Sequence, residues 1–581
     1  MLSTLLLSIG QPLWAQQTPE KEKAAAFNTR LTVKEVTDRV QTTVPAIMRE
    51  AGVPGLSMAL IRDRKVVWRH GFGVKNAKTK DPVDDATVFE AASLSKPVFA
   101  YAVLKLVESG KLDLDAPLTK YLPDPYVPDE PRLNLITARR VLTHSTGFPN
   151  WRGGQPLKIN FTPGERFSYS GEGFVYLQKA VEHVTGKPLN ELARELVFSP
   201  LGMTSSSYVW EDRYETLKAY SHNSSGAVAG RNKPDEANAA ASLHTTATDY
   251  ATFMAAILDH KGLTETMVRE MLQPQIKVDE NCAVCFNRAA GKLSAAISWG
   301  LGVGLYHGPE GDAFWHWGDN GNTMAYMVAY PGKKLGVVVF MNSADGLSLA
   351  DEVVYQALGV HQPQLTWTHT EPYNSPGMKV FKDILKRGQV AITEYKQARK
   401  DKKSIALPES RMNTLGYLLI AKGRTDNAIE IFKMNVDDFP DSWNAYDSLG
   451  EAYFRAGDDA QAIKNYQRSL ELNPKNTSAS TVLDRIEHPK VAVDAKLLES
   501  YVGKYHDDKF GTLMITKTGN HLWGSVEEDS DAPAELIPKS ADRFSVPAAQ
   551  SEVRFVTDGN GGVAYALIKA GKDEIKAIRV Q

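Results

Sequence analysis

The sequence is poor in cysteine, in net charge and in long apolar runs. Only two of its 581 residues are cysteines, and its formal net charge is −2. So small a charge gives no electrostatic basis for binding nucleic acid, and the one basic run, RKDKK at residues 399–403, fits the solvated end of a helix. No apolar run reaches the ~18 residues of a membrane-spanning helix. These absences argue against a nucleic-acid-binding or transmembrane protein.

The first 22 residues have the pattern of a secretory signal. A short apolar run at residues 2–10 is followed by LWAQQ at 13–17 and by a charged stretch at 20–23. Cleavage is expected near Ala15, although no Lys or Arg precedes the apolar run and Leu13 is large for its position. We therefore expect a periplasmic or secreted protein.

The two cysteines lie close together, in NCAVCF at residues 281–286. A structural metal site needs about four ligands, and no second pair exists. A redox motif would follow a strand in a βαβ unit, whereas Cys282 and Cys285 stand between a helical segment and a Gly-rich strand. This leaves a local disulfide or two free thiols, and no metal or organic cofactor is implied.

Residues 25–362 mix strands and helices. Residues 57–61 and 66–68 read as a hairpin around a polar turn, and 324–330 and 335–341 read as another. Helical stretches such as 96–108 and 174–185 lie between them. This order predicts an α/β domain in which the returning chain completes an antiparallel sheet flanked by helices.

A repeat follows this domain. Seven positions recur at an offset of 34 residues: Leu415 and Leu449, Gly416 and Gly450, Gly423 and Gly457, Ala428 and Ala462, Ile429 and Ile463, Phe432 and Tyr466, and Pro440 and Pro474. The pattern resembles two tetratricopeptide repeats, in which small residues let paired helices approach and aromatic residues fill the space between them. We assign the repeats to 409–487, with a helical linker or degenerate repeat at 366–408.

Residues 490–581 change to short alternating strands. Residues 513–516, 521–524, 554–556 and 563–568 alternate apolar and polar side chains, with Gly-containing turns between them. They predict a small antiparallel β domain.

The strongest chemical signal is AASLSKP at residues 91–97. Residues three apart on a helix share a face, so Lys96 is expected beside the Ser93 hydroxyl. A serine hydroxyl needs an adjacent base to become a nucleophile. The pair alone also fits a helix N-cap serine with an exposed lysine.

Two later segments favour the catalytic interpretation. RFSYSG at 166–171 contains Tyr169, and FWHWGD at 314–319 contains His316 just before the last hairpin. Together with LTHSTG at 142–147, FSPLGM at 198–203 and TATDY at 246–250, their order resembles the group of class C β-lactamases, D-alanyl-D-alanine carboxypeptidases and family VIII esterases over residues 30–345. The C-terminal β domain resembles the lipocalin-like domain often appended to such hydrolases.

The resemblance implies roles for these residues. Ser93 would attack an acyl carbonyl, while Lys96 and Tyr169 would carry its proton and later activate water; which of the two is the base stays open. The backbone N–H groups of Ser93 and Asp319 would form the oxyanion hole, and Gly318 would allow close approach of the substrate. His144 and the turn after it are expected to support the site from behind.

Two departures bear on the substrate. Gly171 stands where the family has an asparagine that contacts the substrate, and His316 stands where a lysine helps to hold a carboxylate. An unperturbed histidine is mostly uncharged at neutral pH, so carboxylate anchoring is weakened; Trp317 is a further candidate for substrate contact.

We therefore expect a serine hydrolase acting on a small-molecule or peptide ester or amide, with weak β-lactamase activity as an option. The alternative is a catalytically weak, penicillin-binding-like receptor or scaffold whose repeats contact a protein partner.

Overall fold

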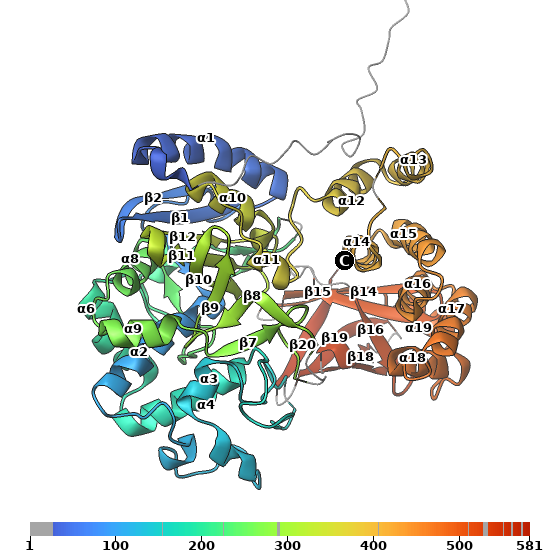
Figure 1. Cartoon of the computed structure of the whole chain (residues 1–581). Coiled ribbons are helices and arrows are strands. Elements are labelled where there is room, and N and C mark those ends of the chain that lie inside the picture. Colours follow the sequence, from blue (N-terminus) through green and yellow to red (C-terminus); the bar gives the residue numbers. More distant parts are fainter. Residues whose placement is uncertain are drawn as a thin grey trace, which may run out of the picture. The chain divides into compact units, whose positions relative to one another are not determined.

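The computed structural model describes residues 27–580, with gaps at 154, 225, 287–290, 405, 509–510, 527–532, 550, 559–561 and 571–572. The expected signal at residues 1–22 therefore lies outside the described residues. The described chain forms two compact units that divide after Tyr373, called here the N-terminal and C-terminal units (Figure 1). None of the described helices is long and apolar enough to cross a membrane.

An eight-stranded sheet, antiparallel throughout, forms the centre of the N-terminal unit. Its strands lie in the order β2 (Lys65–Gly73), β1 (Gly55–Arg62), β12 (Leu335–Met341), β11 (Met324–Tyr330), β10 (Gly311–Asp319), β9 (Gly304–Gly308), β8 (Leu293–Trp299) and β7 (Ile276–Asp279). Both predicted hairpins are present as β1–β2 and β11–β12. Leu56 of β1 pairs with Met341 of β12, so the returning chain completes the sheet as the sequence predicts.

Helices cover both faces of this sheet because successive strand side chains point to opposite sides. Leu56 and Met58 pack with α1 (Val33–Ala51) and α10 (Ala350–Leu358), which lie together in Figure 1. Ala59 packs on the other face, in the core that contains the longest of the remaining helices. These are α2 (Ser95–Glu108), α4 (Gly171–Thr185) and α8 (Ala247–Leu258).

Shorter elements complete the N-terminal unit. The helices are α3 (Ala138–Leu142), α5 (Leu189–Ala193), α6 (Ser199–Leu201), α7 (Tyr214–Leu217), α9 (Glu265–Leu272) and α11 (Gln364–Trp367). The strands are β3 (Phe89–Glu90), β4 (Ser221–His222), β5 (Val228–Gly230) and β6 (His244–Thr245), paired as β3–β6 and β4–β5.

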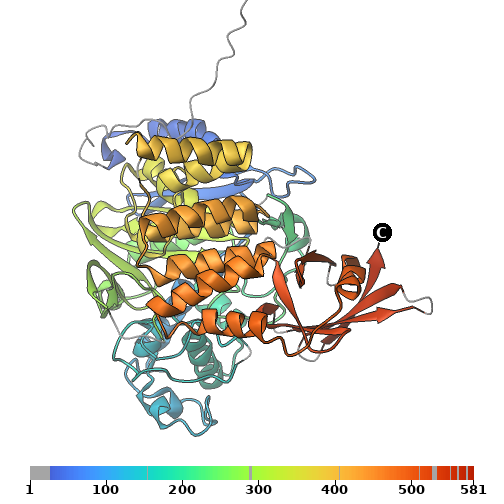
Figure 2. The same cartoon turned by 90° about the vertical axis from the view of Figure 1, so that its right-hand side faces the viewer.

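The C-terminal unit begins with stacked helices, seen from the side in Figure 2. They are α12 (Pro376–Arg387), α13 (Gln389–Lys400), α14 (Glu409–Ala421), α15 (Thr425–Asp438), α16 (Trp443–Ala456), α17 (Asp459–Leu472) and α18 (Thr477–Glu487). A Cβ on Gly416 would lie 2.3 Å from Phe432 Cζ, and one on Gly450 would lie 3.1 Å from the Tyr466 ring. The aromatic rings therefore fill the spaces that the glycines leave, as the repeat pattern predicts.

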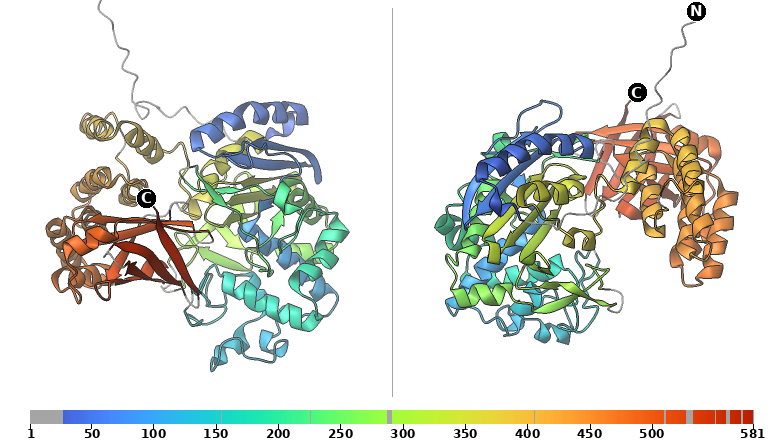
Figure 3. Two further views of the ribbon diagram at one scale, coloured as in Figure 1. Left: turned by 180° about the vertical axis from the view of Figure 1, so that it is seen from behind. Right: turned by 45° about the horizontal axis from the view of Figure 1, so that its top comes forward.

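The chain ends in a closed, eight-stranded antiparallel barrel (Figure 3). Helix α19 (Ala495–Tyr501) precedes it, and β13 pairs with β20 to close it. Its strands are β13 (Gly503–Asp507), β14 (Gly511–Thr518), β15 (His521–Val526), β16 (Ala534–Pro538), β17 (Arg543–Val546), β18 (Ser551–Thr557), β19 (Val563–Ala570) and β20 (Asp573–Val580). The predicted small β domain is thus confirmed as a barrel, which leaves no free sheet edge.

Candidate active site

Ser93 lies in a single 3₁₀ turn, Ala92–Leu94, that runs directly into α2. The turn begins with Ala92 at φ +48°, a left-handed conformation that is uncommon for a residue with a side chain. Tyr250 fixes the turn from below, because its hydroxyl donates to the Leu94 carbonyl at 2.9 Å. Ser93 itself is only half-buried, whereas its neighbours Ala92 and Leu94 are buried.

Lys96 is fully buried directly behind this serine. Its Nζ lies 3.0 Å from Ser93 Oγ and donates to the Ala240 carbonyl at 2.8 Å. Burial lowers the pKa of Lys96 well below its usual value of 10.5, because desolvation disfavours the ammonium. A neutral amine has a lone pair that can accept the Ser93 proton.

Tyr169 lies on the other side of Lys96, whose Nζ is 4.8 Å from the centre of the phenol ring. Burial raises the pKa of Tyr169 above its usual 10; the nearby Ser93 hydroxyl lowers this pKa by a smaller amount, and the charge of Asp319 raises it further. The phenol is therefore protonated at neutral pH. Its hydroxyl makes no hydrogen bond of ordinary geometry within the part of the chain that the structure describes, so it is free to serve a reacting group.

His144 supports Tyr169 from behind, as expected. The two rings are stacked with their centres 4.2 Å apart, and the Ser170 N–H donates to His144 Nδ1 at 3.0 Å. Burial lowers the pKa of His144 well below 6.5, and the neighbouring Lys96 and His316 lower it further. The ring is therefore a neutral support rather than a charged group.

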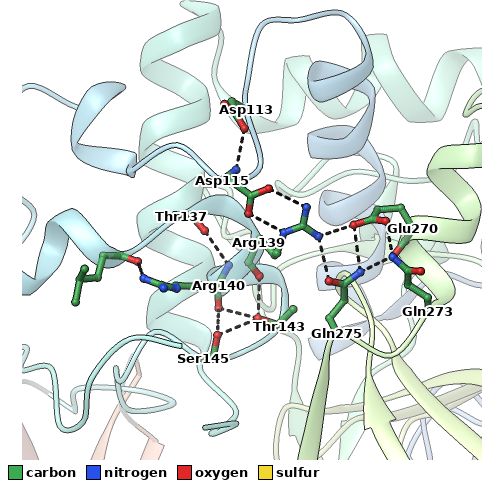
Figure 4. Close-up of polar contacts among 11 residues, drawn as sticks. Asp113, Asp115, Thr137, Arg139, Arg140, Thr143, Ser145, Glu270, Gln273 and Gln275 are labelled. Atoms are coloured by element: carbon green, nitrogen blue, oxygen red, sulfur yellow. Dashed lines mark hydrogen bonds and ion pairs between the residues drawn. The ribbon is translucent and has the colours of Figure 1, made fainter. Parts of the chain in front are cut away.

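Helix α3 leads into the turn that carries His144, and Figure 4 shows the polar contacts of Arg139, a residue of this helix. The Arg139 guanidinium donates to both carboxylate oxygens of Asp115, at 2.7 and 2.9 Å, and also bonds Glu270 and Gln275. Because these partners come from separate segments, Arg139 ties the start of the turn to the rest of the unit.

His316 projects from β10 into the same cluster, 5.9 Å from Tyr169 between ring centres. Its Nδ1 is 2.7 Å from the Trp317 carbonyl, and Trp317 lies 4.9 Å from Tyr169 between ring centres. Burial, and then the charge of Lys96, lower the pKa of His316 to about 3. His316 is thus uncharged over the physiological range and cannot act as a cationic anchor.

Gly318 brings β10 against the Ser93 turn. A Cβ at this position would lie 2.4 Å from the Ala91 carbonyl oxygen, so the close approach that it permits is between these two protein segments. Asp319 follows at the exposed end of the strand.

Sequence reasoning missed a buried ion pair at Glu90, whose carboxylate also joins the same two segments through Asn320. Lys218 Nζ lies 2.7 Å from Glu90, and Asn320 Nδ2 donates to the other Glu90 oxygen at 3.1 Å. Burial raises the pKa of Glu90, but Lys218 and His244 offset this and leave it below its usual value. The Glu90 carboxylate therefore stays ionised. It lies three residues before Ser93 and accepts a hydrogen bond from Asn320, the residue that follows Asp319.

The cysteine pair lies beside Tyr169, a second connection that the sequence did not reveal. Cys282 and Cys285 form a disulfide, which answers the alternative that the sequence left open. Within this loop, the Ala283 carbonyl accepts from the Tyr169 N–H at 2.8 Å, and the Cys285 N–H donates to Ser168 Oγ at 3.0 Å. The disulfide loop thus holds the backbone that carries the phenol.

Gly171, the first residue of α4, is covered by Trp151, which sequence reasoning also missed. A Cβ on Gly171 would lie 2.6 Å from Trp151 Cη2, so the indole rests directly on the glycine. The structure therefore brings Ser93, Lys96, Tyr169 and His316 into one cluster, with Gly171 and Trp317 beside it.

Within the described segments, no group of three or more His, Cys, Asp or Glu residues is arranged to hold a metal ion.

Three family models match parts of the chain. The family model described as Beta-lactamase matches residues 40–361, which is more than half of the chain. A tetratricopeptide repeat model matches residues 443–476, and a model described as a domain of unknown function (DUF3471) matches 487–577.

Individual relatives are distant. Esterase EstB of Burkholderia gladioli is 30% identical over 204 residues, which are 29% of this chain and 51% of the esterase. Penicillin-binding protein 4 of Amycolatopsis lactamdurans is 25% identical over 57% of this chain and 93% of its own length. A solved D-alanine carboxypeptidase AmpC from Burkholderia cenocepacia has 18% identity and a TM-score of 0.47, and the match covers 56% of this chain and 99% of the enzyme.

Proposed function

The chain belongs to the beta-lactamase family, and from this premise we propose that it is a serine hydrolase that forms an acyl-enzyme at Ser93. The observation that carries the proposal is the 3.0 Å contact between Ser93 Oγ and the Nζ of a buried lysine. Burial lowers the pKa of Lys96, which makes the neutral amine, the form that can accept the Ser93 proton, easier to reach.

In the proposed reaction, Lys96 and Tyr169 transfer different protons. Neutral Lys96 accepts the Ser93 proton as Oγ bonds to the acyl carbon, and the displaced electron pair moves to the carbonyl oxygen. The N–H groups of Ser93 and Asp319 stabilise that oxyanion. Tyr169, protonated because its pKa is raised, donates to the leaving alkoxide or amine and is reprotonated through Lys96. In the second half of the reaction, water gives a proton to Lys96 and attacks the acyl carbon. The bond from this carbon to Ser93 Oγ then breaks, Oγ is reprotonated, and the acid is released.

The substrate we propose is an ester or amide without an essential carboxylate. His316, with a pKa lowered to about 3, supplies no charge where related β-lactam-binding sites use a cation. We therefore expect ester or D-amino-acid amide turnover to exceed β-lactam turnover.

Turnover of three compounds tests this reaction: p-nitrophenyl acetate, a D-alanine p-nitroanilide and nitrocefin. Fluorophosphonate labelling of Ser93→Ala identifies the nucleophile, with Ser109→Ala, an exposed serine just past α2, as the control. We expect labelling to vanish only in Ser93→Ala. Unchanged labelling of that variant would remove Ser93 as nucleophile, and much faster nitrocefin turnover would refute the substrate preference.

The pH dependence tests the assignment of the base. Activity should rise as Lys96 loses its proton, and because its pKa is lowered, the rise should be complete well below pH 10.5. Since kcat/KM reports the free enzyme, its pH profile is the measurement, and Lys96→Arg should abolish the rise along with most of the activity. A profile in Lys96→Arg that matched the unmodified protein would assign the titration to another group.

We further propose that the protein is exported and that its repeats contact a protein partner. The Cys282–Cys285 disulfide supports export, because disulfides persist in oxidising compartments. The tetratricopeptide match supports protein contact. Cell fractionation of the full-length protein tests the first proposal, since recovery only from the cytoplasm would refute it.

A further inference from the structure

A half-exposed tryptophan that no catalytic step requires lies beside the site. Trp151 is 46% exposed, an unusual environment for so large an apolar side chain, and its ring centre lies 6.0 Å from Lys96 Nζ. It therefore lies near the group that we propose activates Ser93, with an exposed surface that a bound substrate can contact.

The residues before and after Trp151 are both hydrogen-bonded to the start of α4. The Gly171 N–H donates to both the backbone and the side-chain oxygen of Asn150, each at 3.0 Å. On the other side, the Arg152 backbone N–H and guanidinium bind Glu172, at 3.1 and at 2.7–3.0 Å. Trp151 thus lies between two residues fastened to the first turn of α4.

Gly171 is the residue that makes this position available. A Cβ there would come within 2.6–2.9 Å of three atoms of the indole, closer than real Cβ contacts. Any larger residue at 171 would therefore displace the ring, so the glycine and the tryptophan form one unit.

The charges around the indole favour an uncharged group. Lys96 has a lowered pKa, His316 is neutral, and the Arg152 cation is paired with the largely buried Glu172. The Arg152 cation is therefore already paired and His316 offers no positive charge to a substrate carboxylate, whereas an aromatic or branched apolar group can stack on the exposed indole face.

Resting on the proposed function, we infer that Trp151 is a specificity-determining residue that selects substrates with an aromatic or bulky apolar acyl group. The test compares kcat/KM for p-nitrophenyl phenylacetate and p-nitrophenyl acetate. In Trp151→Ala we expect the phenylacetate-to-acetate ratio to fall about tenfold, mainly through KM for the phenylacetyl ester, because a stacking surface is lost.

Three matched variants separate recognition from folding. Trp151→Phe keeps an aromatic ring and should retain most of the ratio, whereas Gly171→Ala should lower it by displacing the indole without removing it. Trp443→Ala removes a similarly exposed tryptophan, 40% exposed in α16, and should change nothing.

The outcomes distinguish the two claims. If Trp151→Ala leaves the ratio unchanged, or lowers turnover of both esters equally, the inference is overturned while the serine hydrolase assignment stands. If the unmodified protein hydrolyses neither ester and Ser93 is not labelled, the proposed function itself fails.

Discussion

Replacing Lys218 by methionine removes the partner of Glu90 while keeping the length of the side chain. The two side chains are 1% and 7% exposed, so water cannot solvate the carboxylate that remains. Breaking a buried ion pair from one side costs about 3–5 kcal/mol. If the free energy of unfolding falls by about 3 kcal/mol per molar urea, this loss lowers the unfolding midpoint of the N-terminal unit by about 1–1.7 M.

A readout specific to this unit is needed because the chain unfolds as more than one unit. A pulse of excess fluorophosphonate, short relative to refolding and normalised to each variant's labelling without urea, reports the fraction of molecules in which the N-terminal unit is folded. The initial rate in the absence of urea should also fall about tenfold, because Glu90, which binds Asn320 beside the oxyanion-hole strand, loses the cation that fixes its position.

The double variant Glu90→Gln with Lys218→Met is the control, because it removes both charges. Its unfolding midpoint should return most of the way to that of the unmodified protein, since replacing a buried ion pair by uncharged groups often changes the free energy of unfolding little. An unchanged midpoint in Lys218→Met, or a double variant no more stable than the single one, would refute the reasoning.

Three other predictions follow from particular contacts. His316 has a pKa of about 3 in the folded chain and about 6.5 when unfolded; the unfolded state therefore binds more protons, and stability falls as the pH drops from about 6.5 towards 3. His316→Gln should flatten this slope in midpoints measured by circular dichroism, and an unchanged slope would contradict the assignment. Reducing the Cys282–Cys285 disulfide should lower kcat/KM about tenfold by loosening the backbone of Tyr169; the double serine variant should show the same loss and no further response to reductant. Gly416→Ala, whose Cβ would lie 2.3 Å from Phe432, should cost about 1–3 kcal/mol in the C-terminal unit; Gly450→Ala, at 3.1 Å from Tyr466, should cost less, and the reverse order in thermal unfolding would argue against this packing.

The parts of the fold that the sequence predicted are those with local or periodic signals. The two hairpins are marked by β-rich runs around short turns, and the repeats by seven residues that recur at an offset of 34. Ser93 and Lys96 are three residues apart, so helical geometry alone places their side chains together.

The remaining contacts of the site join segments that are distant in the sequence. Glu90 and Lys218 are 128 residues apart, and Cys285 reaches Ser168 across 117 residues. No local pattern marks such partners. Trp151 lies only four residues beyond the LTHSTG segment, but its position on Gly171 depends on how two separate turns fold against each other.

The pairing of Leu56 with Met341 has a consequence for the order in which the protein can be made. Strand β1 leaves the ribosome early, yet its neighbour β12 is synthesised only after every helix that flanks Ser93. The nascent chain must therefore carry an incomplete sheet, with an unpaired strand edge, through most of the synthesis of its first unit. A chain arrested before residue 335 would lack β12 altogether, and a chaperone that covers strand edges would be needed most in that interval.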